Sequence, residues 1–479
     1  MKMLILNKQK HNEPEFGELS RMLDDLKDIL NETPNFNNHD WNKNFNCILN
    51  FQDSDGSFKL FDSYEIPGDA RVDFCWMPTY ICTAILMKSY MTDSSSFGSK
   101  EESALLEGLK MSSRKNLRGH GYDAFKGQIE ALEIFMKAGL REFLDIHEDF
   151  CTEFSEMVGK IITKFDDMES KGEFFGPWGE SYEAEIKSVN EYFSKRNVFV
   201  YGTLMKGETN HHYLENSICL GPAVIEGYDM YNVGWYPAIT TGDNMIVGEL
   251  YQVPKEDMFA IDMLEGEGHL YIKKCETITI DGGKTALAFV YIYMKDCSNL
   301  ERIPAWKRDY VWYVSYGSNM LKERFLCYIK GGSYEGSAHR KPCRDTTPPL
   351  AVKTVELPYD MYFGNISRSW EYRGVSFIDT SKKGHALGVA YLITKEQLEH
   401  VSTEENGGTR PEESNGWYTD VIDLDTMNGF EVKTITNDNL RQYNEPSSSY
   451  LNTLHNGIRE NWPSMSDQEI DDYLKNCIR

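Results

Sequence analysis

Two segments in the second half of the chain repeat each other, and this repeat limits the possible fold more than any other feature. The segments are MIVGELYQVPKE (245–256) and HALGVAYLITKE (385–396). Gly248 aligns with Gly388 without a gap, and seventeen residues beyond each glycine stands a glutamate, Glu265 or Glu405. Repetition at several linked positions favours two copies of one structural unit. We therefore expect the two strands that carry these glycines to occupy equivalent places in one fold.

Each copy begins with a short apolar strand that ends in Tyr-Gly and a hydroxyl residue: NVFVYGT in the first and WYVSYGS in the second. In the first copy, Gly202 at the strand end lets the backbone approach a ligand closely. The successive N–H groups of such a turn form a concavity that binds anions. The hydroxyl of Thr203 adds a donor, so the turn is a candidate carboxylate-binding loop.

The glutamate of the first copy follows an amphipathic segment, MFAIDML, and stands at its C-terminal end beside apolar side chains. Such a place disfavours the charged carboxylate and raises its pKa, which suits a group that moves protons near neutral pH. A carboxylate-binding loop that faces one such glutamate suits acyl chemistry on an amino acid. For either copy alone, a turn glycine and a surface glutamate would be the simpler interpretation, but the linked repeat favours the functional one.

The residue pattern changes along the chain and predicts three domains, at residues 1–195, 196–305 and 306–479. Residues 1–195 show helical periodicity, for example at Leu19, Met22, Leu23, Leu26 and Leu30. From residue 197 the pattern changes to short runs rich in Val, Ile and Tyr, separated by Gly and Asn, which indicates strands. Beyond residue 447 the pattern is helical again.

Charge and cysteine usage exclude several classes of function. A formal net charge of −25 over 479 residues argues against a nucleic-acid-binding or basic membrane-surface protein. The longest apolar stretch, YICTAILM (80–87), is far shorter than the ~20 residues of a membrane span. The ten cysteines form no C-x-x-C pair, and the N-terminal apolar run is too short for a secretory signal. We expect a cytoplasmic protein with reduced thiols and no metal.

The N-terminal half carries motifs without supporting chemistry. NFQDSDGSF (50–58) and GHGYDAFKGQIEALEIFMKAGL (119–140) resemble the helix-turn units of α/α-toroid proteins, but no D-x-D-D acid and no Cys-Cys-His zinc set accompanies them. A calcium loop in DSDG would need an acid where Phe51 stands. We assign His120 to a turn and the His211-His212 pair to a solvated loop. The N-terminal domain, residues 1–195, is expected to be a scaffold that shapes or covers a substrate entrance.

Residues 197–296 resemble the gamma-glutamylcyclotransferase-like superfamily, in the branch with the gamma-glutamylamine cyclotransferases. The matching stretches are VFVYGTLMKG, GWYPAI, VGELYQV and IDMLEGEGHLYIKK. Residues 311–479 resemble a longer bacterial branch, through WYVSYGSNMLKERFLCYIKGG, MYFGNISRSWEYRGVSFID, LGVAYLITKEQLEHVSTEENG and PSSSYLNTLHNGIREN. The fold class expected from this resemblance is multidomain: an α-helical, α/α-toroid-like N-terminal domain followed by two α+β cyclotransferase-like β-barrel domains with flanking helices.

The resemblance implies an enzyme that releases 5-oxoproline from a gamma-glutamyl amine, peptide or pathway intermediate, without a cofactor. The substrate's α-amine attacks its own γ-carbonyl, while Glu265 or Glu405 carries the proton from the ammonium to the leaving amine. In the second copy Glu404 precedes the glutamate, and we prefer Glu405 because it keeps the seventeen-residue register. The substrate's α-carboxylate would be held by Tyr201, Gly202, Thr203 and Leu204 in one copy and by Tyr316, Gly317, Ser318 and Asn319 in the other.

Two alternatives remain open at this point. One or both β-barrels could be non-catalytic and hold an acidic metabolite for regulation, although a mere binder has no need of a base. The helical domain could instead be the enzyme, but its missing acid and metal signatures count against that. In every case the expected partner is a small molecule, with neither nucleic acid nor membrane, and the sequence does not fix the oligomeric state.

Overall fold

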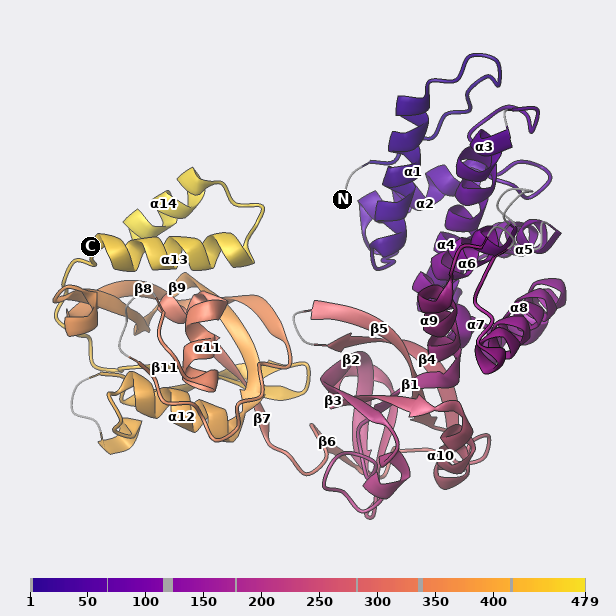
Figure 1. The fold of residues 1–479 in the computed structure, drawn as a ribbon. Coiled ribbons are helices and arrows are strands. Elements are labelled where there is room, and N and C mark those ends of the chain that lie inside the picture. Colours follow the sequence, from indigo (N-terminus) through magenta and orange to yellow (C-terminus); the bar gives the residue numbers. More distant parts are fainter. Residues whose placement is uncertain are drawn as a thin grey trace.

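The computed structural model describes residues 3–66, 68–114, 124–176, 179–280, 283–334, 339–413 and 417–478. Along the chain it has a helical region, a first β-sheet with one helix, and a second β-sheet with helices on it (Figure 1). A large hydrophobic cluster centres on each of the three, and the cluster of the second sheet extends to Val224, Met245 and Val247 of the first. The domain boundaries at 195 and 305 stay predictions.

The helical region packs around α4 (Met77–Thr92), in which every residue from Pro78 to Met87 is buried. A helix that is apolar all round belongs inside a protein, so the longest apolar stretch of the sequence is a core helix. None of the described helices is both long and apolar enough to cross a membrane. The surrounding helices are α1 (Phe16–Asn31), α2 (His39–Phe51), α3 (Gly68–Arg71), α5 (Ser99–Arg114), α6 (Ala124–Lys137), α7 (Leu140–His147), α8 (Thr152–Lys171) and α9 (Glu183–Ser194).

Of the motifs named in this region, the DSDG loop lies within the described residues. The Lys59 ammonium lies 3.2 Å from a carboxylate oxygen of Asp53 and 3.5 Å from one of Asp55. Both carboxylates of the DSDG loop therefore form ion pairs with this lysine. The predicted turn residue His120 lies outside the described residues. The α/α toroid stays a prediction.

The first sheet has the strand order β3-β1-β5-β4-β2-β6. Strand β2 also pairs with β3, so the pairings run around a closed ring from β3 through β1, β5, β4 and β2 back to β3. Its elements are β1 (Lys195–Val200), β2 (Ile218–Asn232), β3 (Pro237–Pro254), α10 (Met258–Glu265), β4 (Tyr271–Ile280), β5 (Lys284–Tyr293) and β6 (Glu301–Ile303).

The second sheet has the order β10-β11-β7-β9-β8, and its end strands β10 and β8 do not pair with each other over the described residues. We expected a β-barrel in each copy, but this sheet is open. Its elements are β7 (Tyr310–Ser315), α11 (Lys322–Lys330), β8 (Val352–Ser367), β9 (Arg373–Thr394), α12 (Lys395–Glu405), β10 (Asp420–Met427), β11 (Phe430–Thr436), α13 (Ser448–Asn461) and α14 (Asp467–Asn476).

The repeated strands pair in the same register in both sheets. In the first sheet, Val200 of β1 lies opposite Glu249 of β3. These are the second residue before Gly202 and the first residue after Gly248. In the second sheet, Ser315 of β7 lies opposite Val389 of β9, at the same positions relative to Gly317 and Gly388. A parallel strand, β5 or β11, lies on the other side of β1 or β7. The two glycine strands thus occupy equivalent topological positions, as the repeat predicts.

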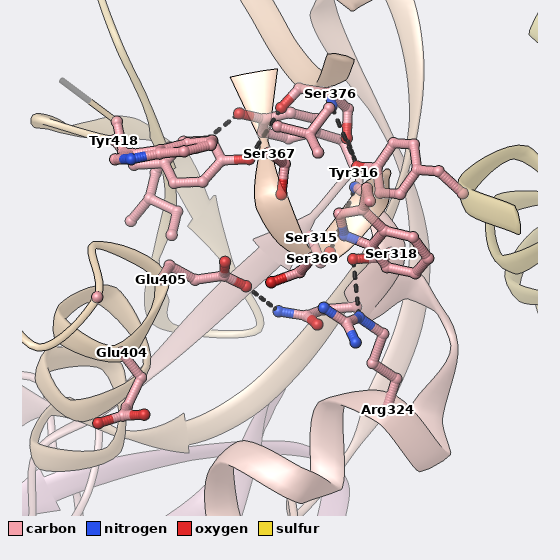
Figure 2. Close-up of a pocket in the computed structure, with 18 of the residues that line it drawn as sticks. Ser315, Tyr316, Ser318, Arg324, Ser367, Ser369, Ser376, Glu404, Glu405 and Tyr418 are labelled. Atoms are coloured by element: carbon pink, nitrogen blue, oxygen red, sulfur yellow. Dashed lines mark hydrogen bonds between the residues drawn. The ribbon is translucent and has the colours of Figure 1, made fainter. Parts of the chain in front are cut away.

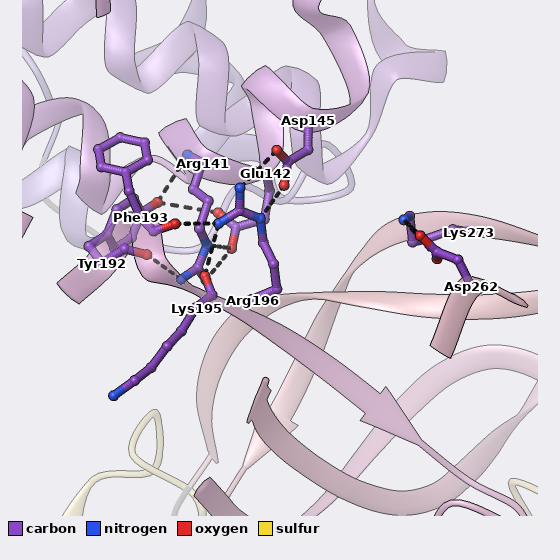
Figure 3. A network of polar contacts seen from close by, with 9 residues as sticks. All are labelled: Arg141, Glu142, Asp145, Tyr192, Phe193, Lys195, Arg196, Asp262 and Lys273. Carbon is purple, nitrogen blue, oxygen red and sulfur yellow. Dashed lines mark hydrogen bonds and ion pairs between the residues drawn. The ribbon is translucent and has the colours of Figure 1, made fainter. Parts of the chain in front are cut away.

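A buried polar network joins the helical region to the first strand of the first sheet (Figure 3). Arg196, at the start of β1, donates two hydrogen bonds to the carboxylate of Asp145 on α7. Beside it, Arg141 and Glu142 form a buried ion pair, and the Arg141 Nη1 group donates to the carbonyl of Tyr192 at 2.8 Å. Breaking a buried pair is costly, so this network fixes the direction in which the chain leaves α9 and enters β1.

Candidate active sites

The first cavity lies at the end of β1 and has a volume of about 180 Å³. All four residues of the predicted first loop, together with Glu265, line it. A Cβ atom at Gly202 would stand 2.6 Å from the Pro237 ring, so close packing requires glycine there. The amide N–H groups of Thr203 and Leu204 form no hydrogen bond with any described residue. They are therefore free donors at the cavity wall, the arrangement that binds an anion.

Glu265 ends helix α10 and lines this cavity together with the loop. Its half-buried carboxyl makes no hydrogen bond or ion pair with a described residue, and Tyr201, Tyr271 and Tyr291 are among its neighbours in the wall. Desolvation by these surroundings raises the pKa of Glu265 to about 7. A carboxyl with this pKa can both take and give a proton near neutral pH.

We expect Glu265→Gln to stabilise the protein in neutral and alkaline solution. Because the pKa of Glu265 is raised from 4.5 to about 7, its protonated form favours folding fully below pH 4.5, and that contribution is lost as the pH rises to about 7. The shift corresponds to at most ~3 kcal/mol. Glutamine carries no charge, so the variant should exceed the wild type in free energy of unfolding above pH 7 and lose this advantage below pH 4.5. Urea denaturation of both proteins, above pH 7 and below pH 4.5, measures this difference in the free energy of unfolding.

The matched control is Glu267→Gln, since Glu267 is exposed two residues further on. A surface substitution of this kind changes stability by about 0.5 kcal/mol or less. Equal stability of Glu265→Gln and the wild type at pH 8 would show that Glu265 is not desolvated.

The second cavity lies at the end of β7 and is larger, with a volume of about 470 Å³. All four residues of the second loop line it, and so do Glu404 and Glu405. A Cβ atom at Gly317 would stand 2.6 Å from the Ser376 hydroxyl, so glycine is again required by close packing. As in the first copy, the N–H groups of Ser318 and Asn319 form no hydrogen bond within the described chain.

Glu405 and Glu404 point in different directions (Figure 2). Glu405, the last residue of α12, reaches toward the loop and accepts a hydrogen bond of 2.6 Å from the Asn319 Nδ2 group. Glu404 is turned away from the loop, and its carboxylate lies 3.6 Å from the Arg340 guanidinium. Of the two glutamates, Glu405 is the one in contact with the predicted loop.

The tyrosines of the repeat hold the loops in place. Tyr201 donates its buried hydroxyl to the Tyr291 carbonyl on β5 at 2.5 Å, and Tyr316 does the same to the Ile435 carbonyl on β11 at 2.7 Å. The hydroxyls of Tyr201 and Tyr316 are therefore occupied, which leaves their rings and the loop backbone to face a ligand. In the second copy, the repeat residue Tyr391 donates to the Asn319 carbonyl at 2.9 Å.

Some features of the sites differ from expectation. We assigned His211 and His212 to a solvated loop, but His211 is half-buried and its Nδ1 atom lies 3.0 Å from the carbonyl oxygen of Leu204 in the first loop. His212 is exposed.

Among the described residues, no group of three or more His, Cys, Asp and Glu side chains is arranged to hold a metal ion.

Two residues that the sequence pattern does not predict support the loops. Asn210 donates from Nδ2 to the Thr203 hydroxyl at 3.0 Å, and Arg324 donates from Nε to the Ser318 hydroxyl at 2.9 Å. Arg324 stands within the quoted motif WYVSYGSNMLKERF, seven residues after the loop glycine. Its position in the motif was the available signal, but helix α11 is what brings it back to the loop.

Comparison with known proteins identifies relatives of one part of the chain. Residues 198–310 match the family model described as gamma-glutamyl cyclotransferase, AIG2-like. A protein of Methanocaldococcus jannaschii assigned as a gamma-glutamylcyclotransferase is 40% identical over 107 residues, which make up 22% of this chain and 88% of that protein. The gamma-L-glutamyl-butirosin B gamma-glutamyl cyclotransferase of Niallia circulans is 32% identical, over 25% of this chain and 80% of that protein.

A third relative is much longer than the matched region. Histone deacetylase 5 of Arabidopsis thaliana is 28% identical over 217 residues, which make up 36% of this chain. The chain spans 32% of that relative's length.

Proposed function

We propose that this chain, which belongs to the gamma-glutamylcyclotransferase family, is an enzyme with two sites that release 5-oxoproline from gamma-glutamyl amides. One observation carries the proposal. In each copy, the glutamate seventeen residues beyond the strand glycine ends a helix at the wall of a cavity, which a Tyr-Gly loop also lines. The N–H groups of the two residues after the loop glycine form no hydrogen bond with a described residue.

The loop and the glutamate divide the chemistry between them. The free N–H groups of the loop bind the substrate's α-carboxylate and orient the gamma-glutamyl group. The α-amine nitrogen then attacks the γ-carbonyl carbon, the bond to the leaving amine breaks, and a five-membered lactam forms. Because nucleophile and carbonyl belong to one molecule, holding the folded conformer supplies much of the rate.

The glutamate relays the protons that pass from the attacking nitrogen to the leaving nitrogen. As a carboxylate, Glu265 takes one proton from the α-ammonium, which frees the lone pair for attack, and it delivers this proton to the nitrogen of the leaving amine as the C–N bond breaks. The ring nitrogen then loses its second proton by the same route, so the lactam is neutral and the amine leaves as an ammonium ion. A pKa of about 7 is favourable for both steps, since a general base and acid works best when its pKa is near the working pH. Glu405 acts in the same way in the second site, with Asn319 holding its carboxylate.

The leaving group is an amine, a peptide or a pathway intermediate. The relative from Niallia circulans is named for the substrate gamma-L-glutamyl-butirosin B, which supports a broad class of leaving groups for this chain. The second cavity is the larger of the two, so it has room for a larger leaving group than the first.

The test is incubation with a panel of gamma-glutamyl amines and peptides, with mass spectrometry of the products. We expect 5-oxoproline and the free amine in equal amounts. The matched control is the same compound with its α-amine acetylated, which cannot cyclise and should remain intact. If no compound of a broad panel yields 5-oxoproline, or if the acetylated compound is cleaved as fast, the proposal is wrong.

We expect chelation to leave this activity unchanged. The proposed mechanism uses one carboxylate and backbone N–H groups in each site, so a metal ion has no part in it. The value of kcat/KM with and without EDTA measures this. Loss of activity that a divalent ion restores would contradict the mechanism.

A further inference from the structure

Arg324 is a buried cation at the second site that has no acidic partner among the described residues. It lies on helix α11, is 6% exposed and lines the cavity with Ser318 (Figure 2). Its Nε group donates to the Ser318 hydroxyl, and its guanidinium carbon lies 5.0 Å from the centre of the Trp370 ring. It forms no ion pair with any described carboxylate, and its Nη1 and Nη2 groups donate to no described residue. A buried charge is costly unless it is paired, so this side chain is suited to an anion that is supplied from outside.

The other charged side chains of the cavity balance one another and so do not cancel this positive charge. Three arginines and two glutamates line it, and one of each, Arg340 and Glu404, are already paired. The second glutamate, Glu405, accepts from the neutral side chain of Asn319. The third arginine, Arg368, is exposed. In a chain with a formal net charge of −25, the second cavity is thus a cationic spot.

The first site has a neutral side chain in the equivalent place. There the Thr203 hydroxyl accepts its hydrogen bond from the amide of Asn210, as Ser318 accepts from Arg324. Among the described residues that line the first cavity there is no lysine or arginine. The two loops are therefore supported in the same way, and the charge of the supporting group is the difference between them.

We propose that Arg324 binds a carboxylate of the substrate in the second site, and that the first site, with Asn210 in its place, does not depend on such a contact. This inference rests on the proposed function of the second site. One N–H of the guanidinium is used by Ser318, and the fork of Nη1 and Nη2 is left to bind a carboxylate, the geometry in which arginine binds best. The carboxylate belongs either to the gamma-glutamyl group itself or to the leaving amine.

Two matched compounds separate these sources: gamma-L-glutamyl-L-alanine and gamma-L-glutamyl-ethylamine, which differ in the carboxylate of the leaving amine. Both are assayed with Glu265→Gln protein, so that the first site is silent. Adding Arg324→Gln should raise KM about 10- to 100-fold, the usual effect of losing a hydrogen bond to a charged group. A rise for the alanine compound alone assigns the carboxylate to the leaving amine, and an equal rise for both assigns it to the gamma-glutamyl group.

Controls distinguish binding from support of the loop. Lys330→Gln removes an exposed charge from the same helix and should leave KM unchanged, and Arg324→Lys should recover part of the affinity. KM does not depend on the fraction of folded protein, so a variant that merely folds poorly lowers the rate and leaves KM as it was. An unchanged KM for both compounds in Arg324→Gln would overturn the inference.

A binding measurement keeps this test separate from the proposed function. In Glu265→Gln/Glu405→Gln protein, gamma-L-glutamyl-L-alanine carries both carboxylates and is not turned over. Calorimetry should show two binding events, of which Arg324→Gln weakens one about 10- to 100-fold. If the wild type releases no 5-oxoproline but Arg324→Gln still weakens this binding, the proposed function fails and the carboxylate contact stands. If turnover occurs but both binding events are unaffected, the inference about Arg324 alone is wrong.

Discussion

Glu405→Gln is expected to lower turnover in the second site about 10²–10⁴-fold, the usual contribution of a positioned acid–base group. Glutamine keeps the shape of the side chain and can still contact Asn319, but it cannot take the proton from the α-ammonium. Affinity should largely survive, because the free N–H groups of the loop are untouched. Steady-state kinetics, together with calorimetry of a slowly reacting analogue, separates the two effects.

The neighbouring glutamate is the matched control for this variant. Glu404 is turned away from the loop and lies beside Arg340, so Glu404→Gln should be much milder. If Glu404→Gln removes the activity and Glu405→Gln keeps it, the seventeen-residue register has identified the wrong carboxylate.

Glu265→Gln should have an equally large effect, about 10²–10⁴-fold, confined to the first site. In the wild type, kcat/KM for a first-site substrate should rise with pH through about 7, where Glu265 loses its proton and becomes the base. The variant should lack this rise. A pH profile from 5 to 9 measures both the loss and the missing titration.

The two single variants also test whether the sites are independent. The loops differ in sequence and the cavities differ in volume and charge, so each variant should remove one activity and spare the other. The double variant should have neither. Wild-type rates on every substrate in all three variants would mean that both glutamates are structural.

The sequence predicts the core of both sites because the repeat encodes register. Side chains alternate along a strand, so a slip of one residue would turn every inward side chain outward, and two copies with the same spacing must pair alike. That is why Gly248 and Gly388 have equivalent partners, and why each glutamate stands at the wall of the same cavity as the Tyr-Gly loop of its copy.

What the sequence could not predict depends on tertiary contacts. Arg324 reaches the second loop because helix α11 turns back toward it, whereas Asn210 reaches the first loop from an irregular segment, and no shared spacing links the two. The hydroxyls of Tyr201 and Tyr316 bond to carbonyls of a strand far along the chain, and nothing in the Tyr-Gly motif specifies these partners. The closed ring of the first sheet depends on a pairing of β2 with both β3 and β4, which strand patterns alone do not specify.

The central claim is that the substrate's own amine, and not water, attacks the γ-carbonyl. It is tested most directly by turnover in water labelled with heavy oxygen, followed by mass spectrometry of the product. Intramolecular attack predicts unlabelled 5-oxoproline, formed in equal amount with the free amine and lost in the Glu265→Gln/Glu405→Gln variant. Glutamate that carries one heavy oxygen atom in place of 5-oxoproline would show hydrolysis and contradict the cyclotransferase mechanism.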